Sequence, residues 1–236
     1  MYRLILWLII FAVVLNLILF YRFTFISNLD QYQRKYVDYD SFDTGDILLV
    51  SFENFGKFFV GSMLNMEFLH PTIVVKEEGE TYVLEVMGYT NKKGFLKLKL
   101  EEWINRNKNC NIMVNKLDIE DDSKETREEL ARKLLAYTNR YTDGSEKITD
   151  VGYFDLSWFR YLNPKGIYKH PKLESGKTPC NEFCTRILVE AGVVKGDKPL
   201  EHYYPDQFIG MKGFTVNQPY RYGEHFLCDL NRFMKK

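Results

Sequence analysis

Two cysteines one helical turn apart are the residues of this sequence best placed to do chemistry. Cys180 and Cys184 lie in the stretch ESGKTPCNEFCTRILVEAGV. Thr178 and Pro179 are typical of a helix start, because threonine caps a first turn and proline loses no hydrogen bond there. Cys180 then stands in the first turn, where the helix dipole and the backbone amides stabilise a thiolate. Cys180 is therefore the candidate nucleophile.

Cys184 lies one turn further along the same predicted helix, on a stripe of apolar residues. A free cysteine on such a stripe packs as a small hydrophobic residue, so we expect Cys184 in the core. The alternative is a zinc site built from Cys180, Cys184 and a histidine. Two cysteines at this spacing supply only two ligands, and the other two cysteines of the chain fall in distant segments. We predict no metal and no cofactor.

A nucleophilic cysteine needs a base. The candidates are His70, His170, His202 and His225. His70 directly precedes the apolar run Pro-Thr-Ile-Val-Val, which predicts a buried strand that would hold the ring rigidly. The next predicted strand carries one carboxylate, Glu85, flanked by leucine and valine. A histidine and a carboxylate on neighbouring strands can meet across the ladder, and the carboxylate then fixes the imidazole tautomer. Alternatively, Glu85 lies on an open sheet face.

The elements that must position these residues are a mixture of strands and helices. Strand patterns cover residues 46–52, 70–76, 81–86, 94–100, 110–117 and 224–230. Helical patterns cover residues 54–66, 101–107 and 122–141, and a fourth helix begins near Cys180. The aromatic segment 152–162 either lines a substrate cleft or packs in the core. The fold class predicted from this order is α+β.

The N-terminal segment is strongly apolar. Residues 4–20 are 17 residues with only Asn16 polar, which reaches the lower limit for a membrane-spanning helix. A cleaved signal peptide is the competing interpretation, but the run is long for one and no small-x-small site follows it. We predict an anchor over residues 1–28, a polar spacer over 29–44 and one domain over 45–236. The basic residues after the apolar run favour a cytoplasmic domain.

Charge and cysteine content exclude several classes of protein. Lys plus Arg and Asp plus Glu both number 32 and form no long blocks, so a nucleic-acid partner is not expected. Four cysteines in 236 residues are too few for a disulfide scaffold. The richness in Asn, Lys, Tyr, Phe and Ile resembles proteins of AT-rich genomes such as those of large DNA viruses. We therefore expect other virion proteins as partners and a virion membrane as one location.

The order of motifs along the chain carries a family resemblance. TGDILLV comes first, followed by LHPTIVV, YVLEV, PCNEFCTRILVEAGV and YYPDQF. This order resembles the circularly permuted papain-like group, the NlpC-type branch with YiiX-like proteins, a poxvirus family and the lecithin:retinol acyltransferase relatives. In that group a cysteine opens a helix in a Cys-Ser-Glu type motif. Cys180-Asn181-Glu182 matches it with asparagine in place of serine, and the resemblance covers residues 45–208.

The resemblance implies a permuted papain-like fold, with a central antiparallel sheet and a helix that bears the nucleophile. It implies Cys180 as nucleophile, His70 as general base and Glu85 as the third member, with the Cys180 amide as part of an oxyanion hole. The implied reaction is attack on an acyl carbon of a peptide, isopeptide or lipid, through a thioester. A structural or adaptor protein of the membrane or virion, which keeps the fold and acts by contacts, is the alternative.

Overall fold

A computed structural model describes residues 2–26, 28–51, 67–87, 94–142, 178–200 and 203–229. The helices are α1 (Tyr2–Ile26), α3 (Leu100–Arg106), α4 (Lys124–Thr142) and α5 (Cys180–Glu190), with 3₁₀ turns η1 (Asn28–Gln31), η2 (Tyr39–Ser41) and η5 (Pro205–Met211). The strands are β1 (Arg34–Lys35), β2 (Ile47–Ser51), β3 (His70–Glu77), β4 (Glu80–Met87), β5 (Gly94–Lys99), β6 (Asn111–Ile119) and β7 (Tyr220–Cys228). The predicted helix at 54–66 and the aromatic segment 152–162 lie outside the described residues.

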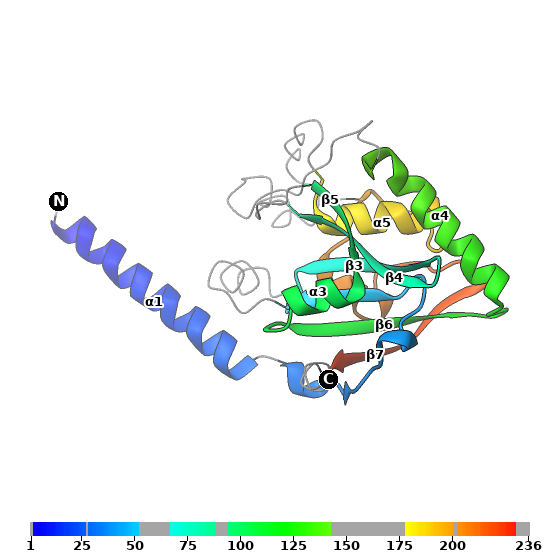
Figure 1. The fold of residues 1–236 in the computed structure, drawn as a ribbon. Coiled ribbons are helices and arrows are strands. Elements are labelled where there is room, and N and C mark those ends of the chain that lie inside the picture. Colours follow the sequence, from blue (N-terminus) through cyan, green and yellow to red (C-terminus); the bar gives the residue numbers. More distant parts are fainter. Residues whose placement is uncertain are drawn as a thin grey trace.

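The strands form one seven-stranded sheet in the order β1-β7-β6-β2-β3-β4-β5 (Figure 1). Every pair is antiparallel except β1 with β7, which is parallel. The predicted α+β class is therefore confirmed, and so is a sheet that is antiparallel through its centre. The strand that follows His70 lies in the middle of this sheet, between β2 and β4.

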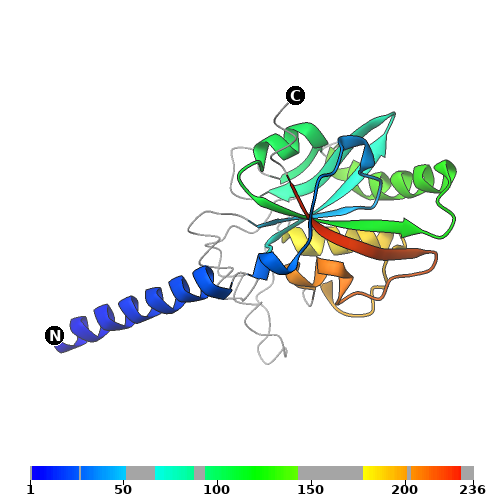
Figure 2. The same ribbon diagram turned by 90° about the horizontal axis from the view of Figure 1, so that it is seen from below.

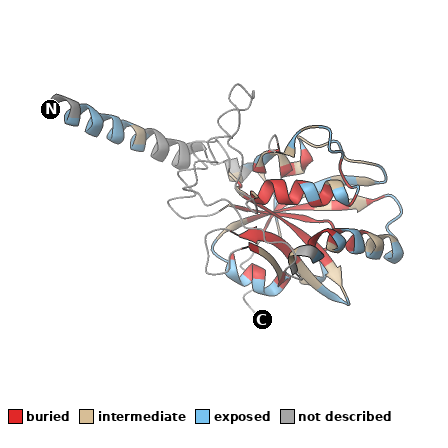
Figure 3. Cartoon of the chain, turned by 90° about the horizontal axis from the view of Figure 1, so that it is seen from above, coloured by how far each residue is buried: buried red, intermediate tan, exposed pale blue. Residues whose placement is uncertain are grey.

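Helices cover both faces of the sheet, because the central strands are apolar on both sides. One face packs under α3, whose Leu100, Trp103 and Ile104 join a cluster with Val50 and Val74. The other face packs under α4, α5 and η5. Figure 2 shows α3 and α5 on opposite sides of the sheet, and Figure 3 shows that α5 is buried along most of its length. The nucleophile helix is thus held against the centre of the sheet.

A tight hairpin sets the register of β3 and β4. Glu78 and Gly79 both have positive φ, at 52° and 82°, as a two-residue type I′ turn requires. The hairpin pairs Ile73 with Leu84 and Val74 with Val83. If this register continues, residue 70 lies opposite residue 87, so that Glu85 is the diagonal neighbour of His70 on the same face.

Part of the segment predicted as a spacer over residues 29–44 packs with the domain. Strand β1 pairs with β7, placing Arg34 beside Leu227. Val37 and Phe42 are buried in the same cluster as Trp103. The segment is predicted as a spacer because it is mostly polar. Those apolar residues nevertheless close one face of the sheet.

Gly45, at the entry to β2, adopts a conformation that side chains disfavour. Its φ is +94°, and a Cβ there would clash with Cδ2 of Leu117. We expect Gly45→Ala to destabilise the fold by about 1–3 kcal/mol, measured as a drop in Tm. Gly79→Ala is the matched control, since Gly79 also has positive φ but has open space around it. Equal losses for the two variants would contradict the predicted clash.

Helix α1 extends away from the sheet and its covering helices (Figure 1). Its described side chains between Ile5 and Leu17 are mostly exposed, with Trp7 at 69% and Phe11 at 66%. Among the described residues, no helix has the length and hydropathy required to cross a membrane. The apolar N-terminal segment therefore forms a helix, whereas the predicted transmembrane character of that helix is not confirmed.

Candidate active site

Cys180 is the first residue of α5. Pro179 is the N-cap, with φ −62° and ψ 149°, and its carbonyl accepts the first helical bond from the amide of Phe183 at 3.0 Å. The prediction had Thr178 as the cap, so the helix begins one residue later than expected. The amides of the first turn and the positive end of the helix dipole lie at Cys180, and both favour a thiolate there.

The thiol of Cys180 lies against the start of β3. Its Sγ is 3.5 Å from the carbonyl oxygen of Leu69, a distance at which a thiol donates a weak hydrogen bond. Leu69 is joined to His70 by the next peptide group, and the side chain of Cys180 is buried. The structure therefore brings the predicted nucleophile to the peptide group adjoining the predicted base, although 111 positions separate Cys180 from Leu69 in the sequence.

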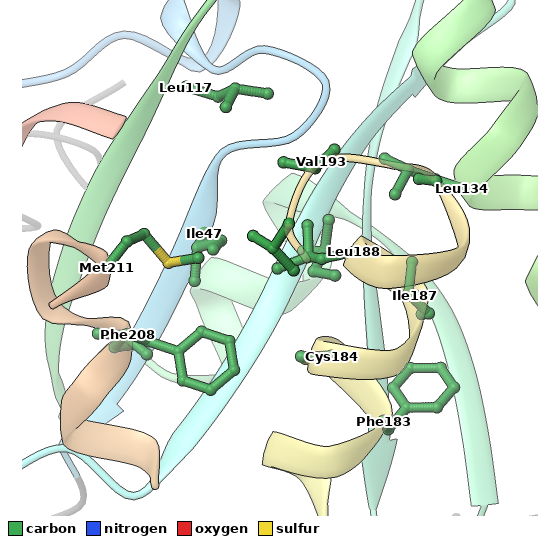
Figure 4. Close-up of a cluster of buried hydrophobic side chains, with 14 of the residues drawn as sticks. Ile47, Leu117, Leu134, Phe183, Cys184, Ile187, Leu188, Val193, Phe208 and Met211 are labelled. Atoms are coloured by element: carbon green, nitrogen blue, oxygen red, sulfur yellow. The ribbon is translucent and has the colours of Figure 1, made fainter. Parts of the chain in front are cut away.

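Cys184 lies in the core, as predicted. It is fully buried, and Figure 4 shows its side chain among those of Phe183, Ile187 and Leu188. Its Sγ donates to the carbonyl of Pro71 at 3.2 Å. The two cysteines thus contact the carbonyls of Leu69 and Pro71, at the start of β3, from successive turns of one helix. The role of Cys184 is to pack α5 against β3.

His70 and Glu85 form a buried pair. Nε2 of His70 lies 3.0 Å from Oε2 of Glu85, and their side chains are 3% and 1% exposed. The predicted contact across the β3–β4 ladder is therefore confirmed, and the alternative that Glu85 lies on an open sheet face is wrong. The pair lies on the α3 side of the sheet, since His70 is paired with Val50 and Glu85 contacts Trp103.

Two further residues bind the Glu85 carboxylate, and both come from α3. Nε1 of Trp103 donates to Oε2 at 3.0 Å. The guanidinium of Arg106 donates to the other oxygen, Oε1, and forms an ion pair with the carboxylate. Neither residue is predicted from the sequence as part of the site, although an arginine and a tryptophan in one short helix are candidates for any buried carboxylate. No spacing rule connects them with Glu85.

The environment of Glu85 decides which ring nitrogen of His70 carries a proton. Burial alone would raise the pKa of the Glu85 carboxyl, but its hydrogen bonds and charge interactions with His70 and Arg106 outweigh burial and lower that pKa. The carboxylate is therefore ionised at neutral pH and can only accept hydrogen bonds. Nε2 of His70 must be the donor, so Nδ1 is the nitrogen that can take up a proton.

The residue after the nucleophile ties the start of α5 to the chain segment before η5. Asn181 is 1% exposed, and its side-chain amide donates to the carbonyl of Tyr203. Its own carbonyl accepts from the hydroxyl of Thr185 at 2.8 Å. Serine at this position is too short to reach as far. The asparagine that departs from the expected motif therefore positions the first turn that carries Cys180.

The other histidines do not compete with His70 within the described residues. His225 lies on β7, where its ring packs beside Gly210 and stacks edge-on with Tyr32. It pairs across the ladder with Asn115 on β6, and β7 is three strands away from β3 in the sheet. His170 and His202 lie outside the described residues. Within that same part of the chain, no three His, Cys, Asp or Glu side chains gather as a metal site would need.

Comparisons with known proteins find similarity among solved structures. No protein-family model matches the sequence, and no curated protein does. Among solved structures the chain is similar to the crystal structure of metalloprotein yiiX from Escherichia coli O157:H7, DUF1105, with a TM-score of 0.41 and 15% sequence identity. The match covers 75% of this chain and 89% of that chain. At this identity and TM-score it does not assign the chain to a family.

Proposed function

We propose that this protein is a cysteine hydrolase or acyltransferase of the permuted papain-like type, with Cys180 as nucleophile, His70 as general base and Glu85 as the third member. The observation that carries the proposal is that two buried groups, a thiol and an imidazole–carboxylate pair, both lie at the start of β3. One is the thiol at the helix start, 3.5 Å from the Leu69 carbonyl. The other is the imidazole–carboxylate pair that begins with the next residue.

In the proposed reaction His70 and Cys180 must meet at the end of β3, because the His70–Glu85 pair lies on the α3 side of the sheet and α5 lies on the other. Nδ1 of His70 takes the proton of the Cys180 thiol, and the thiolate attacks the acyl carbon of the substrate. The bond to the leaving group breaks, and the leaving group takes the proton from the imidazolium. Water or another acceptor then attacks the thioester with the same histidine as base, and the thiol is restored. Backbone amides of the first turn of α5 stabilise the oxyanion of each step.

The proposal is tested by trapping the thioester. The full chain is incubated with activated peptide, isopeptide and lipid esters, quenched with acid and mapped by mass spectrometry. We expect an acyl group on Cys180 that neutral hydroxylamine removes, and the substrate that gives the highest occupancy identifies the class of bond cleaved. Acylation on another cysteine, or no acylation by any of the three classes, would contradict the assignment.

Helix α1 supports attachment of this enzyme to a lipid bilayer. Residues 4–20 are apolar on every side of the helix, and a helix of that kind requires an apolar environment. Within the described residues, α1 obtains none from the domain, since its side chains from Ile5 to Val14 are exposed. We therefore propose that the substrate is met at a membrane surface.

Vesicle flotation checks this attachment. The full chain should float with phosphatidylcholine vesicles, because the apolar helix partitions into lipid. A variant that lacks residues 1–28 should stay at the bottom of the gradient and should keep its thioester chemistry at Cys180. Flotation of both forms to the same extent would show that α1 is not the membrane contact.

A further inference from the structure

Helix α1 has two unlike sides. One stripe along it recurs at intervals of four, three and four residues and consists of Ile5, Ile9, Ala12 and Asn16. Because an α-helix repeats about every 3.6 residues, these side chains lie on one side of it, and all of them are exposed. Trp7 and Phe11 project from the other side. Intervals of four and three residues are those of the seam along which two helices pair in a coiled coil.

Asn16 is the polar residue of this stripe. Its Nδ2 donates to the carbonyl of Ala12 at 2.7 Å, within the same helix. Among the described residues its Oδ1 has no hydrogen-bond partner, and the amide keeps a second N–H that can donate. An amide without partners costs free energy in apolar surroundings, whereas an identical amide supplies both a donor and an acceptor. Asn16 is therefore a polar group that a second α1 can satisfy.

Ala12 lies one turn before Asn16, and its side chain is the smallest within residues 4–20. Small residues at a contact let two helices approach closely, so that the short side chain of an asparagine can reach across. On the opposite side of α1, Trp7 and Phe11 would keep the axes of two helices apart. A second helix therefore fits on the side of Ala12 and Asn16.

We propose that two copies of this chain associate through α1, with their Asn16 amides hydrogen-bonded to each other. Asn16 lies nearer to the end of residues 4–20 that leads into the domain. An antiparallel pair that overlaps along the whole run sets Asn16 opposite Leu8, whose side chain offers no hydrogen-bonding group. A parallel pair sets the two Asn16 side chains opposite each other. The two domains therefore lie at the same end of the paired helices.

This association goes beyond the proposed catalysis. It requires apolar surroundings, and it rests on the membrane attachment proposed above only for the place where it occurs. Detergent micelles supply such surroundings as well as lipid does, so the pairing can be measured apart from binding to vesicles. On a membrane, the parallel pair would hold two Cys180 sites at the same surface.

The association is tested by energy transfer between full chains that carry a donor or an acceptor dye on the N-terminal amine. The two are mixed in detergent micelles with a reductant present, and transfer is followed as detergent is added. We expect transfer that falls on dilution and on addition of unlabelled chain. Asn16→Leu should weaken the association by about fivefold or more, because the bond between the helices is lost while α1 stays apolar. Asn16→Gln keeps the amide and should weaken it less.

Two further variants locate the contact on α1. Val14→Leu changes an exposed apolar residue on the side of Trp7 and should leave the association unchanged. Ala12→Leu adds bulk beside Asn16 and should weaken it. No transfer in the wild type at any dilution, or equal association of wild type and Asn16→Leu, overturns the proposal. Transfer that persists after removal of residues 1–28 would place the contact in the domain and overturn it too.

The readout separates this inference from the proposed function. Energy transfer requires neither enzymatic activity nor vesicles, so a chain that associates through Asn16 but never forms a thioester would refute the function and leave the pairing in place. A chain that forms the thioester at Cys180 and floats with vesicles, but shows no energy transfer, would refute the pairing and leave the function and the attachment in place.

Discussion

Cys180→Ala should reduce acyl transfer by about a thousandfold or more, because removal of the nucleophile leaves only substrate binding and oxyanion stabilisation. Labelling by a thiol-directed acyl probe should disappear with it. The side chain of Cys180 is small and lies at the start of α5, so the variant should fold with a Tm close to that of the wild type. Activity is measured with the best substrate from the thioester experiment.

Cys184→Ala is the matched control for this variant. It removes a thiol from the same helix, four residues further on and fully buried. We expect it to lose about 1–2 kcal/mol of stability from lost packing and to retain probe labelling and activity. Equal loss of labelling in the two variants would show that the probe reports folding, and full activity in Cys180→Ala would exclude Cys180 as the nucleophile.

Glu85→Ala should be among the most destabilising single changes in the described core, at about 3–5 kcal/mol, since removal of one partner leaves the others buried without compensation. His70, Trp103 and Arg106 all lose their acceptor. Chemical denaturation at pH 7 measures the loss. Glu129→Ala is the control, because that carboxylate pairs with Arg132 at the surface and should contribute little to stability.

The Glu85 carboxylate makes the free energy of unfolding depend on pH. The folded-state pKa of Glu85 is below its unfolded value, because His70 and Arg106 together outweigh the effect of burial. Its contribution to stability is complete above the unfolded pKa, about 4.3, and is lost as the pH falls through the folded pKa. Wild-type stability should therefore fall more between pH 5 and pH 3 than that of Glu85→Gln. Parallel curves for the two proteins would contradict this sign.

The pairing of His70 with Glu85 was predictable from the sequence for a physical reason. Side chains alternate between the two faces of a strand, and a tight turn fixes the register of the two strands that it joins. The alternation and the turn together therefore place two distant side chains on one face of the sheet. The burial of Cys184 was predictable in the same way, because it follows from the spacing of apolar residues along a single helix. Local rules reach this far because the hairpin and the helix are local structures.

Trp103 and Arg106 could not be predicted as partners of Glu85. They contact it only because α3 folds back over the sheet after β5, and the path of that crossing depends on packing along the whole face. Strand β1 was missed for a related reason. Its two residues, Arg34 and Lys35, have no strand pattern of their own. They form a strand because they pair with the edge of β7.

The residue that caps the start of α5 could not be predicted from the local sequence. Threonine followed by proline indicates a helix start, but the pattern allows either residue to be the cap. The structure makes Pro179 the cap, and without a side-chain hydroxyl it forms no side-chain capping bond. The first turn is instead held by tertiary contacts, among them the bond from Asn181 to Tyr203. Such contacts carry no signature in the local sequence.

The parallel pairing of β1 with β7 imposes an order on folding. Backbone bonds at 2.9 Å join Leu227 to Gln33 and Asp229 to Lys35, so the segment that follows α1 is fastened by the last strand of the sheet. During synthesis this segment emerges early and must wait for nearly two hundred residues until its partner exists. The segment from Gln33 to Lys35 therefore becomes ordered on the sheet only after β7, the last strand in the chain, has been made.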